Sequence, residues 1–103
     1  MEQQVYIQDH YLWIHMPKEL DHNMAEAIRK EADNQMMQKD VENVVFDFSK
    51  TQFMDSSGIG FIVGRYKKIQ CLGGQAIVVH ASRRIQQMLT MAGLKELVHI
   101  VEE

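Results

Sequence analysis

Three helical patterns alternate with short apolar runs along most of this chain, and that alternation constrains the fold more than any other feature. A strand followed by one helix and another strand forms a parallel pair with a right-handed crossover. Residues 43–48, 75–79 (QAIVV) and 97–101 (LVHIV) are the runs predicted to be such strands. The helical stripes contain Leu20, Met24, Ala25, Ile28, Ala32 and Met36, then Ile59, Ile62, Val63, Tyr66 and Ile69, then Ile85, Met88, Leu89 and Ala92.

The first 16 residues follow a different period. Apolar and more polar side chains alternate over 5–8 and again over 11–16, with Asp9 and His10 between the two runs and Pro17 after them. Period-two alternation around a short polar turn predicts a β-hairpin. The expected order is therefore β-β-α-β-α-β-α-β: an α/β single domain over 1–103, with a mostly parallel sheet and an antiparallel N-terminal hairpin at its edge.

Composition narrows the class of protein. The chain has 103 residues, 46% of them apolar, and a formal net charge of −3, so nucleic acid is not an expected partner. The start lacks a basic segment followed by an apolar run, and no apolar stretch approaches the ~18 residues that cross a bilayer. A single cysteine, Cys71, excludes an internal disulfide. We expect a cytoplasmic protein that contacts no membrane.

The stretch DSSG, from Asp55 to Gly58, lies where a strand gives way to a helix, and such loops at the carboxyl ends of strands carry function. Catalysis is disfavoured, because neither Ser56 nor Ser57 has a glycine two residues before it, as a nucleophile elbow requires. The histidines are scattered and show no metal-ligand spacing. We expect no catalytic residue and no metal site.

A phosphate cradle is disfavoured as well. The glycines at 58, 60 and 64 fit neither a dinucleotide fingerprint nor a Walker motif. Gly60 and Gly64 lie four residues apart on one helix face, and close approach of a neighbouring backbone is the interpretation we favour for them. No cofactor is expected.

Helix capping explains part of the stretch. With Asp55 as the N-cap, its carboxylate can accept from the backbone N–H of Gly58, and Met54 can pack on Ile59 as a hydrophobic staple. Ser56 is then the first helical residue and points outward. Asp21 and Ser82 are the expected N-caps of the first and third helices, the third of which ends before Gly93 at its C′ position.

Two interpretations of Ser56 remain open. A polar helix start commonly carries serine for no further reason. Alternatively, the unpaired N–H groups and positive dipole end of a helix tolerate a phosphate, so Ser56 is a candidate modification site. A phosphate there would add a charge of about −1.5 to −2 beside Asp55 and disfavour a partner docking on this surface, without disturbing the fold.

The motif FMDSSGIGFIVGRYKKI resembles the signature segment of the STAS domain, and in particular of the anti-sigma factor antagonists. ELDHNMAEAI resembles the family's entry into its first helix, and GGQAIVV and RRIQQMLTMAGL match the following strand and third helix in kind and order. The resemblance covers nearly the whole chain. Asp-Ser-Ser-Gly followed by Gly-Arg-Tyr-Lys resembles the sporulation (anti-sigma-F) branch, whereas the general-stress branch usually has Asp-Ser-Thr-Gly.

The resemblance implies a phosphorylation-switched binding module. Unphosphorylated, such a protein binds an anti-sigma factor that is also a serine kinase and so releases a sigma factor for transcription. The kinase, with its own ATP, phosphorylates the serine that corresponds to Ser56, and a separate phosphatase resets it. The chain is then a substrate and not an enzyme. We expect a monomer, with weak dimerisation as the alternative.

Around Ser56, the resemblance and the predicted helix suggest residues that contact the partner. Asp55 orders the helix start, while Ser57 and Gly58 supply donors and room for the kinase. The basic residues further along the helix are candidates to pair with acidic groups, although a solvated basic face explains them equally well. The candidate partner-binding residues are Asp21, Asp55, Ser57, Gly58, Arg65, Lys67 and Lys68.

Two departures from the family pattern concern the surface. Pro17 and Lys18 precede Glu19 where relatives usually have glycine, which would alter the turn beside the docking surface. Relatives also carry a C-terminal helix after the last strand, so a face that they cover is expected to be open here. The alternative function is a constitutive STAS interaction subunit of a stress-signalling scaffold or a transport complex. The retained hydroxyl at Ser56 favours the switched module.

Overall fold

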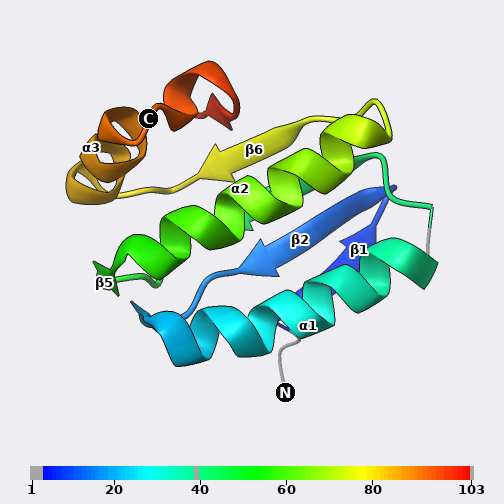
Figure 1. Ribbon diagram of the computed structural model, residues 1–103, viewed down its shortest axis with the longest axis horizontal. Helices are drawn as coiled ribbons and strands as arrows, with labels where there is room; N and C mark the ends of the chain where they lie inside the picture. The colour runs from blue at the N-terminus through cyan, green and yellow to red at the C-terminus, as the bar shows by residue number, and fades with distance from the viewer. Residues whose placement is uncertain (1–3, 39, 103) are drawn as a thin grey trace.

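A computed structural model describes residues 4–38 and 40–102 (Figure 1). Five of its strands form one sheet. The strand order is β1-β2-β4-β6-β7; β1 and β2 are antiparallel and the other neighbours are parallel. The predicted α/β architecture with an antiparallel hairpin edge is confirmed. The strands of this sheet are β1 Val5–Gln8, β2 Tyr11–His15, β4 Asn43–Asp47, β6 Ala76–Val79 and β7 His99–Ile100, and the helices are α1 His22–Gln38, α2 Ser56–Cys71 and α3 Arg83–Met91.

The hairpin turn has the geometry that a twisted two-stranded ribbon requires. Asp9 and His10 both have positive φ, 54° and 68°. Two left-handed residues make a type I′ turn, whose twist matches that of the flanking strands. Val5 pairs with Ile14 and Gln8 with Tyr11, which sends the buried side chains of both strands to the same face.

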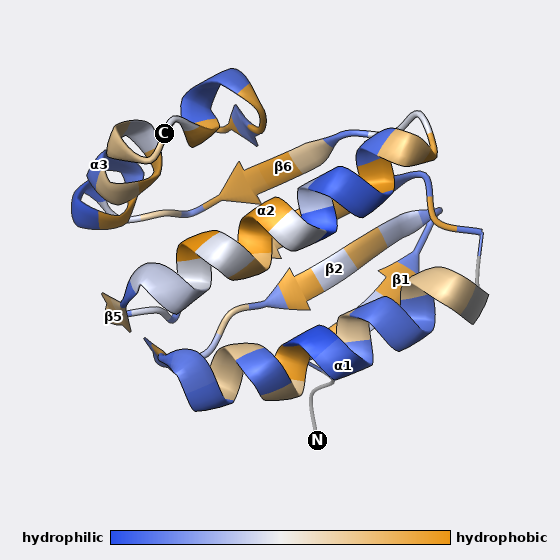
Figure 2. Cartoon of the chain, viewed as in Figure 1, coloured by the Kyte–Doolittle hydropathy of each residue, from blue (hydrophilic) through white to orange (hydrophobic). Residues whose placement is uncertain are grey.

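The core lies between that face of the sheet and helices α1 and α2, which run side by side across it (Figure 1). Figure 2 shows apolar residues along β2 and β6 behind the mixed surfaces of the two helices. For two residues of the predicted apolar stripes, Met24 and Ala92, the prediction of burial is wrong. Met24 is 37% exposed, because it lies in the first turn of α1 at the margin of the packed face. Ala92 is exposed because it is the C-cap of α3 and no longer part of the helix face.

A second, two-stranded parallel sheet was not predicted. It pairs β3 (Glu19–Leu20) with β5 (Phe53–Met54), so Leu20 lies opposite Met54. The backbone N–H of Asp55 donates to the carbonyl of Leu20 at 3.2 Å. Since α1 starts directly after β3 and α2 directly after β5, this pair holds the two helix starts at one edge of the domain.

The C-terminal part differs in detail from the prediction for 97–101. A 3₁₀ turn, Leu94–Glu96 (η1), follows α3, and only His99–Ile100 forms the last strand. Gly93 has φ 81° after the last turn of α3, as expected for its C′ position. Within 4–38 and 40–102, no helix is both long and apolar enough to cross a membrane.

Candidate functional site

The start of α2 places Ser56 as the sequence predicts. Asp55 is the N-cap with extended backbone, and Ser56 is the first helical residue and is exposed. The predicted acceptor geometry of the cap is wrong. The carboxylate Oδ1 of Asp55 accepts from the N–H of Ser57 at 2.8 Å, whereas Gly58 donates to the backbone carbonyl of Asp55 at 3.0 Å. The Gly58 N–H is already bonded within the first turn, so the Asp55 carboxylate pairs with the N–H of Ser57.

Gly58 serves packing within the chain. It is buried, and a Cβ built on it would overlap the Met54 side chain and lie 3.0 Å from Cδ2 of Leu20. The space beside Gly58 is therefore filled by the chain's own Met54 and Leu20 instead of being open to a kinase. The staple from Met54 to Ile59 stays a prediction.

Asp21 caps the neighbouring helix. Its Oδ1 accepts from the backbone N–H of Met24 at 2.9 Å, and its carbonyl accepts from Ala25. The predicted N-cap role is thereby confirmed. In the loop before β5, Thr51 donates its hydroxyl to the carbonyl of Pro17 at 2.8 Å, which ties the turn at Pro17-Lys18 to that loop.

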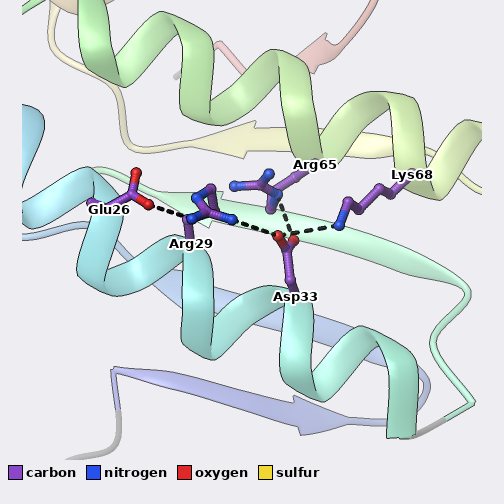
Figure 3. Close-up of polar contacts among 5 residues, drawn as sticks. All are labelled: Glu26, Arg29, Asp33, Arg65 and Lys68. Atoms are coloured by element: carbon purple, nitrogen blue, oxygen red, sulfur yellow. Dashed lines mark hydrogen bonds and ion pairs between the residues drawn. The ribbon is translucent and has the colours of Figure 1, made fainter.

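Arg65 does not lie on an exposed basic face, and the prediction that it does is wrong. Its side chain is only 5% exposed, and Nε lies 2.9 Å from Oδ1 of Asp33 on α1 (Figure 3). Position 65 is three residues after Ile62 and four before Ile69, both buried, so it belongs to the packed stripe of α2. That spacing was the available signal in the sequence.

Asp33 is the centre of an ion-pair network between the two helices. Lys68 Nζ lies 3.1 Å from its Oδ2, and Arg29 Nη1 lies 3.7 Å from the same oxygen while Nη2 contacts Glu26 (Figure 3). The side chain of Lys68 is half exposed and already paired within the chain. Lys67 is exposed and stays a candidate for partner contact.

Burial lowers the pKa of the Arg65 guanidinium, and the Asp33 carboxylate opposes that shift. Arginine has the highest pKa of the ionisable side chains, so the guanidinium keeps its charge at physiological pH. Its carbon Cζ lies 4.9 Å from the centre of the Phe61 ring, which adds a cation–π contact. A permanent positive charge thus lies inside the α1–α2 interface.

The interpretation of Gly60 and Gly64 as close-packing positions is wrong. A Cβ on either glycine would meet no atom within 4 Å. Gly60 instead lines an open cleft between α1 and α2. The other residues that line the cleft are His22, Ala25, Glu26, Arg29, Ser57, Phe61 and Arg65.

One histidine has an orienting partner that the sequence did not reveal. His15 Nδ1 lies 3.0 Å from the Asp47 carboxylate, and Nε2 lies 3.1 Å from the hydroxyl of Tyr6, on which the imidazole also stacks. Adjacent parallel strands bring His15 and Asp47 together, since the two residues are in register. No group of acidic, histidine and cysteine side chains in the described part of the chain is arranged to hold a metal ion.

The model of the STAS domain family matches residues 2–103, so the chain belongs to that family. Within it, the chain is an anti-sigma factor antagonist by similarity to curated members. It is 34% identical over 91 residues to an anti-sigma F factor antagonist of Paenibacillus polymyxa, covering 88% of this chain and 78% of that one. A second such antagonist, from Lysinibacillus sphaericus, is 30% identical over 74% of this chain and 65% of its own.

Comparison with solved structures finds the same fold in anti-sigma factor antagonists. The anti-sigma factor antagonist SpoIIAA in its unphosphorylated form has a TM-score of 0.85 at 27% identity, covering 97% of this chain and 88% of that chain. The phosphorylated form of the Bacillus cell fate determinant SpoIIAA has a TM-score of 0.78 at 27% identity, covering 97% and 91%.

Proposed function

We propose that this chain is an anti-sigma factor antagonist whose binding is switched by phosphorylation of Ser56. In the unphosphorylated state it binds an anti-sigma factor that is also a serine kinase, and a sigma factor is released. The observation that carries the proposal is the exposed hydroxyl of Ser56 at the first position of α2, beside the Asp55 carboxylate. The solved relative exists in phosphorylated and unphosphorylated forms, which supports a switch of this kind.

The site suits a modification that acts on binding and spares the fold. A phosphate at a helix N-terminus gains about 0.3–1 kcal/mol from the dipole, while the neighbouring carboxylate repels it by a comparable amount. The stability of the domain is therefore expected to change little. For a partner docked on this surface, the added dianion brings like charge and a desolvation cost; about 3 kcal/mol would weaken binding more than about a hundredfold.

The proposed docking surface comprises the two neighbouring helix starts, with Asp21, Asp55, Ser56 and Ser57, and extends along α2 to the exposed Lys67 and Lys68 near its other end. Gly58 and Arg65 are absent from it because both are buried. The kinase supplies the ATP, a separate phosphatase removes the phosphoryl group, and the chain acts in the cytoplasm as their substrate and not as an enzyme.

The test uses the anti-sigma F factor of Paenibacillus polymyxa with ATP, because its antagonist is similar to this chain. Mass spectrometry of the mixture should find one phosphoryl group, on Ser56. Ser56→Ala should abolish it and retain binding, whereas the matched control Ser57→Ala should still be phosphorylated. Ser56→Asp should bind more weakly than wild type with a nearly unchanged melting temperature. Phosphorylation elsewhere, or unfolding of Ser56→Asp, would refute the proposal.

A further inference from the structure

The cleft between α1 and α2 is lined by a charged group, the Arg65 guanidinium, whose hydrogen bonds are incomplete. Nε of Arg65 lies 2.9 Å from Oδ1 of Asp33 as an ion pair, whereas Nη1 has no hydrogen-bond acceptor among residues 4–38 and 40–102. The side chain that carries them is 95% removed from solvent, being 5% exposed. A buried guanidinium N–H without a partner is costly, so an acceptor supplied from outside would be strongly favoured.

The ion-pair network around Arg65 contains more positive than negative groups. Arg29, Arg65 and Lys68 provide three cations in the network, and Glu26 and Asp33 provide two carboxylates. The network as a whole therefore has one positive charge more than its two carboxylates balance. An incoming carboxylate balances it, whereas a neutral carbonyl would satisfy only the hydrogen bond.

The cleft is also accessible from the surface where a partner is proposed to dock. Ser57, which follows Ser56 in the first turn of α2, and His22, the first residue of α1, are among its lining residues. At Gly60 the absent side chain leaves open space, with nothing within 4 Å of a Cβ position. Arg29 is the movable part of the wall, because its side chain is 42% exposed and its pairing with Glu26 is of the weak surface kind.

We infer that the anti-sigma partner inserts the carboxylate of one acidic side chain through the opening at Gly60 and pairs it with the buried guanidinium of Arg65. Arg65 is thereby a recognition residue at the floor of a cleft and not a member of an exposed basic face. The inference rests on the proposed function, since it adds to the proposed docking surface a cleft that adjoins it at Ser57 and is entered by the same partner. It also explains why a glycine that packs against nothing stands at position 60.

Two glycines of α2 provide a matched test. Gly60→Leu fills the cleft mouth, while Gly64→Leu adds the same side chain one turn further along, outside the cleft lining. Melting temperatures of the two variants should be similar, since both positions have open space. Titration against the anti-sigma F factor of Paenibacillus polymyxa should show at least about thirtyfold weaker binding for Gly60→Leu, as loss of a buried charge pair predicts, and little change for Gly64→Leu.

A double-mutant cycle identifies the carboxylate. Each acidic residue of the anti-sigma factor is changed to its amide and tested against wild type and Arg65→Lys, with folding of each variant checked by its melting temperature. One partner residue should couple to Arg65 by more than about threefold, beyond the usual error of additivity. Equal binding of the two leucine variants, or no acidic residue that couples to Arg65, would overturn the inference and leave the proposed function intact. If the wild-type protein does not bind the anti-sigma factor at all, both are overturned.

Discussion

Asp33 is the most informative residue to change, because within the described network it is the carboxylate in direct contact with the buried guanidinium of Arg65. In Asp33→Asn the amide keeps the volume of the side chain but removes its charge. Arg65 then remains inside the interface as an uncompensated cation, with its guanidinium still over the ring of Phe61.

The expected loss of stability in Asp33→Asn follows from the burial of the Arg65–Asp33 pair. The side chains of Arg65 and Asp33 are 5% and 14% exposed, and breaking such a pair by removing one partner costs about 3–5 kcal/mol. The pair of Arg29 with Glu26 is far more exposed, at 42% and 45%, so its loss is worth less than about 1 kcal/mol. For a domain near 100 residues, about 3 kcal/mol lowers the melting temperature by about 12 °C or more.

Urea unfolding followed by circular dichroism measures the free energy of unfolding for Asp33→Asn, with Glu26→Gln as the exposed control. The double variant Asp33→Asn with Arg65→Met should recover most of the loss, because an apolar side chain of similar length needs no partner. If Asp33→Asn unfolds within about 1 kcal/mol of wild type, the guanidinium is not held by this carboxylate and the reasoning about burial fails.

Three further outcomes are expected. Gly74→Ala should lose about 3 kcal/mol or more in urea unfolding, because an added Cβ would overlap the backbone carbonyl oxygen of Glu42; a loss below about 1 kcal/mol would contradict this. Gly64→Ala should raise the free energy of unfolding by about 0.4–1 kcal/mol, since its Cβ meets open space and the unfolded chain loses freedom; a decrease would count against it. A hydrogen bond with the Asp40 carbonyl raises the pKa of His10, so its stabilising contribution is present below pH 6.5 and lost as pH rises through the raised folded value. An NMR titration that places the pKa of His10 at or below 6.5 would refute the last expectation.

The features that the sequence predicted are those that neighbouring residues decide. The hairpin follows from alternation on either side of Asp9 and His10, and the cap at Ser82 follows from one side chain reaching a donor three residues later, which the structure confirms at 3.2 Å to Ile85. These contacts need no knowledge of how helices pack. They join residues close together in the sequence, so residue propensities and the period of the apolar pattern are enough to predict them.

The features that the sequence did not predict depend on contacts between segments far apart in the chain. Arg65 finds Asp33 only because α1 and α2 lie side by side, and no rule of spacing links positions 32 residues apart on separate helices. The β3–β5 pair is two residues long on each side, too short to show a period. Gly60 and Gly64 suggest close packing because small residues four apart usually mark a helix contact; α2 instead contacts α1 through the pair of Arg65 with Asp33.

The small β3–β5 ladder has a mechanical consequence. Leu20 and Met54 are in register, and each is followed directly by the aspartate that caps a helix. Backbone pairing of the two strands therefore holds the N-termini of α1 and α2 together. A binding protein that contacts both helix N-termini meets a rigid surface that is already formed before binding. Little freedom is then lost when the complex forms, which favours tight association from a modest area.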